Sequence, residues 1–286
     1  MARLDESEND LRSSVASVAY KPRLKIFLSA DIVGSTALKQ SYKDDISDVV
    51  WPDIIQGFYR NFIESIAAGW LTAQINFQQS GLEASKTERA IEREQKEVFG
   101  PAPKFWKTIG DEVLFWKEIT HEEQVASILA VWLRAVHEVR DFFHRFDEPE
   151  VSGLDIKSTC WIAGFPVRNR MFTVLGNDLS EKSELLDRLY KAEEIDPQLS
   201  YDFVGPAFDI GFRLTNFSTD KKMHLDVATA YLLCIAFDAL NGIQLALLND
   251  IVPAEIGYAS RKPDGHRTLD ERLNIFYSGS EVLKGV

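Results

Sequence analysis

The stretch FLSADIVGST, residues 27–36, is the part of this 286-residue chain that decides the fold. It belongs to a mostly apolar run, which is typical of a buried strand. One carboxylate, Asp31, lies near the C-terminal end of this strand. Gly34 ends the run, and Ser35 and Thr36 are candidates for a helix N-cap. The stretch therefore predicts a strand, a tight turn and a helix start, with an acid beside the turn.

A second acidic turn is expected at Gly110-Asp111-Glu112, because residues 104–109 and 113–116 flank it as the two strands of a β-hairpin. If this hairpin neighbours the first strand, Asp31 and Asp111 converge at one edge of the sheet. Two carboxylates beside a phosphate-sized loop suit Mg²⁺ or Mn²⁺ that carries a nucleoside triphosphate. The residues alone leave an alternative open, in which Asp31 caps a helix, Asp111 shapes a turn and neither binds a metal.

The rest of the chain alternates between helical and strand patterns and contains no internal repeat. A helix is expected over 45–70, with its main part beginning near Pro52, followed by an exposed charged helical segment over 81–98. A long helix is expected after a Thr120/Glu123 capping box. Strands over 154–165 and 201–205 and a helix over 206–216 complete the expected elements. A flexible leader, residues 1–20, precedes them. We expect one domain over 21–286, with insertions near 70–104 and 168–200.

Composition excludes several classes of protein. Lys plus Arg number 32 and Asp plus Glu 44, which gives a net charge of −12 and argues against a nucleic-acid binder. The N-terminal residues are polar and acidic, and the longest apolar stretch is far shorter than the roughly 20 residues of a membrane span. Cys160 and Cys234 lie in apolar runs, which suggests inert thiols in a reducing compartment. We therefore expect a soluble cytoplasmic protein with no membrane partner.

Three segments resemble the motifs of class III nucleotidyl cyclases, in the order that this family has them. Residues 27–36 resemble its first metal-binding motif, Lys107–Glu112 its second and Tyr201–Gly205 its third. Arg213 stands at the spacing of the family's transition-state arginine. The resemblance covers about residues 24–237. It implies a class III cyclase-type α+β fold, an antiparallel-rich sheet flanked by helices around a ferredoxin-like core with insertions.

The resemblance also implies roles for individual residues. Two divalent metal ions, Mn²⁺ or Mg²⁺, would be ligated by Asp31, Asp111 and the Ile32 carbonyl. Lys107 and Asp202 would contact the base, and Arg213 would neutralise charge on the α-phosphate. The remaining candidates are Gly34, Ser35 and Thr36 at the phosphates, Trp51 as a wall of the base pocket, and Asp209, which stands where the family usually has a ribose-orienting asparagine and is spaced to pair with Arg213.

Family members build each site across a head-to-tail dimer, so the resemblance implies a homodimer with two composite sites. A stand-alone cyclase domain that departs from the family at Asp209 and carries the two insertions resembles the pyrimidine cyclases of Pycsar anti-phage defence. Their product, cyclic UMP or cyclic CMP, acts on a separate effector protein. Lys107 can only donate, which favours uracil and hence UTP over CTP, with Trp51 and Phe105 as the bulky groups that exclude purines. The alternatives are an adenylate cyclase and an inactive nucleotide-binding or dimerisation module.

Overall fold

A computed structural model describes residues 22–41, 51–84, 86–174, 200–220 and 222–240. The expected leader over 1–20, most of the insertion over 168–200 and the last part of the expected domain, 241–286, lie outside the described residues. The described part contains the three motif segments and Arg213.

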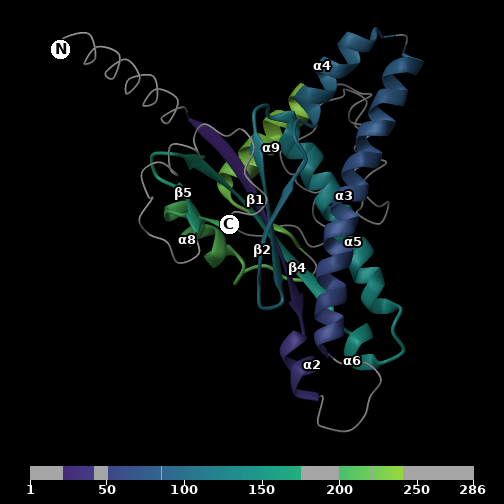
Figure 1. The fold of residues 1–286 in the computed structure, drawn as a ribbon, viewed down its shortest axis with the longest axis vertical. Helices are drawn as coiled ribbons and strands as arrows, with labels where there is room; N and C mark the ends of the chain where they lie inside the picture. Colours follow the sequence, from purple (N-terminus) through teal and green to yellow (C-terminus); the bar gives the residue numbers. More distant parts are fainter. Residues whose placement is uncertain (1–21, 42–50, 85, 175–199, 221, 241–286) are drawn as a thin grey trace, which may run out of the picture.

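A five-stranded sheet with the order β2-β3-β1-β4-β7 lies at the centre of the fold (Figure 1). Its strands are β1 (Arg23–Val33), β2 (Lys104–Ile109), β3 (Glu112–Ile119), β4 (Asp155–Phe165) and β7 (His224–Leu225). All neighbours are antiparallel except β4 and β7. Helix α3 (Trp51–Glu83) connects β1 to β2, and α5 (Glu123–His144) connects β3 to β4. This is the βαββαβ order of a ferredoxin-like core, so the predicted α+β fold class is confirmed.

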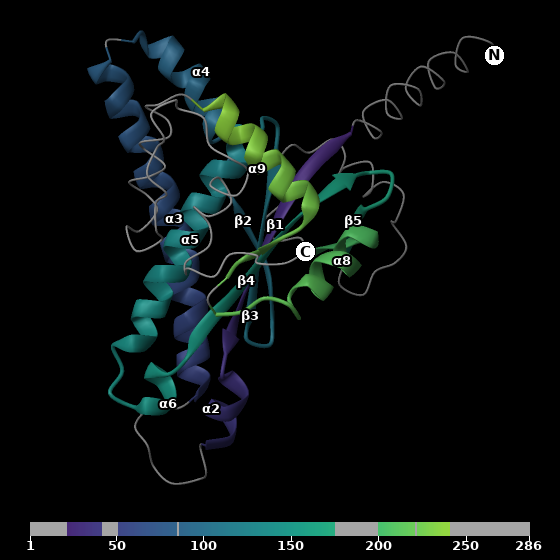
Figure 2. The ribbon, with the colours of Figure 1, turned by 180° about the vertical axis from the view of Figure 1, so that it is seen from behind.

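The two faces of the sheet are covered differently, as the opposite views in Figures 1 and 2 show. Helices α3, α4 (Glu88–Val98), α5 and α9 (Val227–Ala239) cover one face, where Ile26, Leu28, Ala30 and Ile32 of β1 are buried. The short strands β5 (Arg170–Val174) and β6 (Ser200–Val204) and helix α8 (Pro206–Leu214) cover the other face. We call these the helix face and the aromatic face.

The aromatic face is named for the rings that surround Phe27 on β1. The Phe27 ring lies 4.7 Å from Phe208 of α8, 4.9 Å from Phe203 of β6 and 5.7 Å from Trp161 of β4. Such ring pairs add to the free energy gained by burying apolar surface. Since side chains alternate along a strand, Asp31 lies on this same face, four residues beyond Phe27. The aromatic cluster therefore holds the strand that presents Asp31 at the end of the sheet.

The segment predicted as an exposed charged helix is helical and mostly exposed, but one side of it is buried. Helix α3 continues to Glu83 and α4 folds back along it (Figure 1). Ile91 and Val98 of α4 are spaced seven residues apart, on one side of the helix, and both are buried. Phe99 packs edge-on against Trp70 of α3, with their centroids 5.6 Å apart. The charged residues cover only the outer side of this helical hairpin.

The start of α5 also differs from the predicted Thr120/Glu123 capping box. Glu122 is the N-cap and makes no side-chain capping bond. The Thr120 amide instead donates to Gln124 Oε1 at 3.1 Å, and Gln124 Nε2 donates back to Thr120 Oγ1 at 3.0 Å. The helix begins too late for Thr120 to cap it, so the reciprocal pair forms one residue further along the chain. Gln124 Nε2 also donates to the Lys96 carbonyl at 3.0 Å and thereby connects α5 to α4.

Cys160, on β4, is fully buried, and Cys234, on α9, is partly buried; neither is in a disulfide bond. Burial raises the pKa of the Cys160 thiol well above its usual value, which makes the thiol inert. The longest apolar stretch of the sequence, residues 227–237, forms most of α9, which packs on the helix face. Among the helices of the described residues, none is both long and apolar enough to cross a membrane.

Lys117 on β3 is buried beside Gln124, with 1% of its surface exposed. Its ammonium donates to Gln124 Oε1 at 3.1 Å, and burial lowers the pKa of Lys117 to about 7. In the unfolded chain, Lys117 has the ordinary lysine pKa of about 10.4. Between pH 7 and about pH 10.4, the protein therefore takes up a proton when it unfolds. Burying Lys117 therefore costs the most stability below pH 7, and this cost is relieved as the pH rises.

We expect Lys117→Met to be more stable than the wild type at pH 7, with an advantage that shrinks by on the order of 3 kcal/mol by pH 10. Urea unfolding at the two pH values measures this difference. Lys117→Gln, which keeps a polar group without the charge, should lose the same pH dependence. Equal pH dependence of stability in all three proteins would contradict a buried lysine with a lowered pKa.

Candidate functional site

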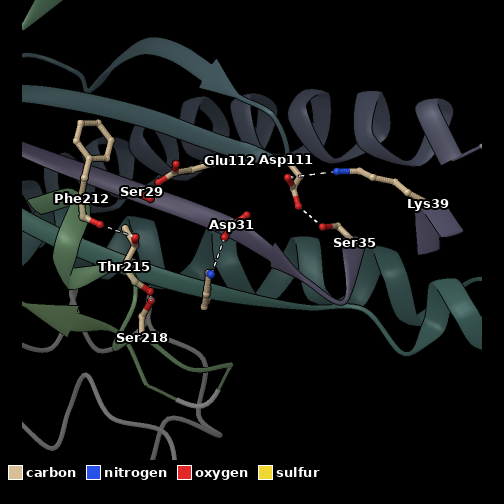
Figure 3. Close-up of polar contacts among 10 residues, drawn as sticks. Ser29, Asp31, Ser35, Lys39, Asp111, Glu112, Phe212, Thr215 and Ser218 are labelled. Carbon is tan, nitrogen blue, oxygen red and sulfur yellow. Dashed lines mark hydrogen bonds and ion pairs between the residues drawn. The ribbon is translucent and has the colours of Figure 1, made fainter. Parts of the chain in front are cut away.

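The end of β1 and the β2–β3 turn bring Asp31 and Asp111 to one edge of the sheet (Figure 3). The Ile32 amide donates to the Asp111 carbonyl at 3.4 Å, which connects the two segments through their backbones. Gly110 precedes Asp111 with a φ of 63°, in the left-handed region that favours glycine, so the hairpin can turn within two residues. The hairpin expected from the sequence is thus present, with Glu112 in the strand and not in the turn.

A lysine ammonium lies against each of the two aspartates. Lys157 Nζ on β4 is 2.8 Å from Asp31 Oδ2, and Lys39 Nζ on α2 (Ser35–Ser41) is 3.3 Å from Asp111 Oδ1. The Ser35 hydroxyl donates to Asp111 Oδ2 (Figure 3). Ser35 is buried, whereas Gly34 and Thr36 beside it are exposed. Of the predicted loop residues, only Ser35 contacts a predicted metal ligand through its side chain.

A third carboxylate, Glu112, lies at the same edge and was not among the predicted site residues. It is the cross-strand partner of Asp31 on β3, and the Ser29 hydroxyl of β1 donates to its Oε1 (Figure 3). Burial raises the pKa of both Asp31 and Glu112, and in each case the nearby charge of Asp111 contributes in the same direction. The groups around this edge therefore do not fully stabilise the ionised forms of Asp31 and Glu112.

Lys107 and Asp202 form a second group, at the junction of β2 with β6. Lys107 Nζ is 2.8 Å from Asp202 Oδ1 and 4.4 Å from the centroid of the Trp106 ring. The Phe203 amide also donates to Asp202 Oδ1, at 2.9 Å. Both contacts that the described residues make to this carboxylate use the same oxygen, so Oδ2 is the oxygen available to a ligand.

Trp51 and Phe105, the residues expected to exclude purines from the base pocket, lie on the other face of the sheet from Lys107. The register of β2 shifts between Phe105 and Lys107, so Phe105 packs 5.6 Å from Phe115 on the helix face, whereas Lys107 reaches β6 on the aromatic face. Trp51, at the start of α3, also packs with the helix-face core, 5.8 Å from the Lys39 ammonium. A bulge breaks the alternation that sequence reasoning assumes, and Trp106 takes the place beside Lys107.

Helix α8 presents Asp209 and Arg213, both exposed. No ion pair joins them, and the structure brings neither into contact with the Asp31 group or the Lys107 group among the described residues. The helix lies close to β4 because Gly211 faces Trp161, where a Cβ would come within 2.4 Å of the indole ring. This packing fixes α8 on the aromatic face with its charged residues outward.

The residues at the sheet edge fit divalent cations bound together with a phosphate-bearing substrate. The described residues contain no group of three or more His, Cys, Asp or Glu side chains in a metal-binding arrangement. Mg²⁺ is commonly held by only one or two carboxylates, with water and substrate phosphates completing its ligands. Asp31 and Asp111 supply two hard oxygen donors of this kind at one edge of the sheet.

The chain is similar to several solved structures of cyclases. It aligns with the adenylyl cyclase CyaB from P. aeruginosa at 10% identity and a TM-score of 0.44, over 75% of this chain and 82% of that one. It aligns with the guanylyl cyclase Cya2 at 10% identity and 0.44, over 74% and 79%. A bacterial light-regulated adenylyl cyclase aligns at 12% identity and 0.41, over 69% and 71%.

No protein-family model and no curated protein matches the chain. The structural similarities are too low to assign an activity.

Proposed function

We propose that this protein is a nucleotidyl cyclase of class III. The ribose 3′-oxygen of a nucleoside triphosphate would attack the α-phosphorus of the same molecule. The bond from the α-phosphorus to pyrophosphate would break as the bond to the 3′-oxygen forms and closes the 3′,5′-cyclic ring. The 3′-hydroxyl proton leaves to solvent, and the products are a cyclic nucleotide and pyrophosphate. The observation that carries this proposal is the convergence of Asp31 and Asp111 beside Ser35 at one sheet edge.

The side chains of this chain would bind and orient the substrate. Asp31, Asp111 and the Ile32 carbonyl would hold two divalent metal ions, Mn²⁺ or Mg²⁺, which activate the attacking oxygen and stabilise the leaving one when bound. Arg213 would balance the charge that develops on the α-phosphate, and Asp209 would orient the ribose. Gly34 and Thr36, which are exposed beside Ser35, would lie along the phosphates.

We propose that the active form is a homodimer in which each site combines two chains. Asp31 and Asp111 would come from one chain, and Lys107, Asp202 and Arg213 from the other. Among the described residues, no ion pair or hydrogen bond joins the Asp31 group to the Lys107 group or to Arg213. Arg213 is exposed on α8, as a residue that reaches a partner's substrate needs to be.

We propose a pyrimidine substrate, UTP more than CTP, and a cyclic product that acts on a separate effector in anti-phage defence. The support is the resemblance to the Pycsar cyclases, which rests on Asp209 and the two insertions, together with the chemistry of the Lys107–Asp202 pair. Lys107 can only donate, which suits uracil O4, and Asp202 Oδ2 can accept from uracil N3–H. Trp106 holds the Lys107 ammonium over its ring and thereby limits where the donor can point.

Incubation of the purified full chain with equal concentrations of UTP, CTP, ATP and GTP and Mn²⁺ or Mg²⁺ tests the proposal, with products identified by mass. We expect cyclic UMP as the main product and pyrophosphate in equal amount. Lys107→Ala should reduce the preference for UTP by about tenfold, because it removes one charged donor to the base. Lys104→Ala, on the same strand but against Trp116, is the matched control and should keep the preference.

Other products separate the alternatives. Cyclic AMP as the main product would identify an adenylate cyclase and overturn the pyrimidine proposal alone. Binding of a nucleotide without any cyclic product, under either metal, would contradict the cyclase proposal and identify a nucleotide-binding module.

A further inference from the structure

Lys157 forms the shortest ion pair at the acidic sheet edge. It lies on β4 directly across from Asp31, as its register partner in the antiparallel β1–β4 pair. Its Nζ is 2.8 Å from Asp31 Oδ2, and the side chains of Lys157 and Asp31 are 30% and 24% exposed. Both residues are part of the central sheet, so their backbones hold them opposite each other. The contact does not depend on a loop.

The charge of Lys157 serves more than one carboxylate. Its ammonium stabilises the ionised forms of both Asp31 and Glu112, while Asp111 acts on both in the opposite direction. A divalent cation that takes Asp31 Oδ2 as a ligand would have to displace this ammonium, or bind within a few ångströms of it. Either event costs free energy, because like charges repel strongly at this range.

We propose that Lys157 is an internal counter-ion that competes with a divalent cation for Asp31 and thereby weakens metal binding to the nucleotide-free protein. This inference rests on the proposed two-metal site. Lys157 is a positioning residue, since it acts through Asp31. Its flexible four-carbon stem lets the ammonium leave Asp31 without movement of β4. Lys157 thus offsets the charge of Asp31 before any metal binds, and a metal ion must compete with Lys157 for Asp31.

A role of Lys157 in supporting metal binding predicts the opposite change in metal affinity when Lys157 is lost. If Lys157 served only to hold Asp31 in a geometry that a metal requires, its loss would weaken metal binding. If it competes, its loss strengthens binding. A change in affinity toward tighter binding is therefore a result that a merely structural role does not produce.

The test is titration of the nucleotide-free full chain with Mn²⁺ at fixed pH and salt, with free Mn²⁺ measured by electron paramagnetic resonance. We expect Lys157→Met to bind Mn²⁺ about tenfold more tightly than the wild type, from removal of one unit charge near a doubly charged ion. Lys157→Gln also removes the charge and should bind Mn²⁺ with the same increased affinity. It replaces Lys157→Met in the test if the methionine variant folds poorly. Lys157→Arg keeps the charge and should bind as the wild type does.

Two further variants separate the inference from the function on which it rests. Lys104→Met removes the same charge at a distant place on the sheet, against Trp116, and should leave the affinity unchanged. Asp31→Asn should lose the binding. Unchanged or weaker binding in Lys157→Met, with binding lost in Asp31→Asn, overturns the counter-ion and leaves the metal site intact. Wild-type binding in Asp31→Asn overturns both.

Discussion

Replacing either Asp31 or Asp111 with alanine is expected to abolish turnover, by at least about a thousandfold, while the protein stays folded. Each change removes one carboxylate from the edge where β1 and the β2–β3 turn meet. The pKa of Asp31 is raised by burial, which indicates that the ionised carboxylate is not fully stabilised there. Its removal should therefore keep the melting temperature at or near that of the wild type.

Cyclic nucleotide formation by each purified variant measures this effect, and circular dichroism on heating measures the folding. Glu138→Ala is a suitable control, since it removes an acid that pairs with Arg134 on the surface of α5. It should leave both turnover and melting unchanged. Activity within tenfold of the wild type in either aspartate variant would rule out the two-metal site.

Mixing two inactive variants is expected to restore activity if each site combines residues from two chains. Asp111→Ala damages the metal side of a site and Arg213→Ala the opposite side. A heterodimer of the two has one intact site and one doubly damaged site. Random exchange makes half of the dimers heterodimers, so the mixture should reach about a quarter of the wild-type activity.

A mixture of Asp31→Ala and Asp111→Ala provides the matched control. Both residues lie at the same sheet edge of one chain, so every site in that heterodimer lacks a metal ligand. This mixture should stay inactive at any ratio. Subunit exchange, followed by fluorescence energy transfer between labelled chains, must be shown for both mixtures. Exchange without recovery in the Asp111→Ala and Arg213→Ala mixture would place the site within a single chain.

The parts of the fold that follow from local sequence pattern were predictable. The apolar run of β1 ends at a glycine, and the β2–β3 hairpin has two strand-like segments around Gly110. Because a hairpin next to β1 must present its turn at one end of the sheet, the meeting of Asp31 and Asp111 could also be foreseen. Both conclusions need only the direction of each strand and its place in the sheet.

The neighbours of those aspartates could not be predicted, because they depend on strand register. Glu112 and Lys157 come to Asp31 only through the exact pairing of β1 with β3 and β4. A slip of one residue would turn either side chain to the other face. The bulge in β2 had the same effect on Phe105 and Trp106, and no feature of the local sequence marks it.

The close packing of α8 on β4 also constrains how this protein can change over evolutionary time. Gly211 has no room for a Cβ because the Trp161 indole occupies that space. A lineage can acquire a larger residue at position 211 only after position 161 has become smaller, so the two positions should vary together among relatives. That paired variation would mark the register of α8 against the sheet in distant sequences, even where Asp209 and Arg213 have been replaced.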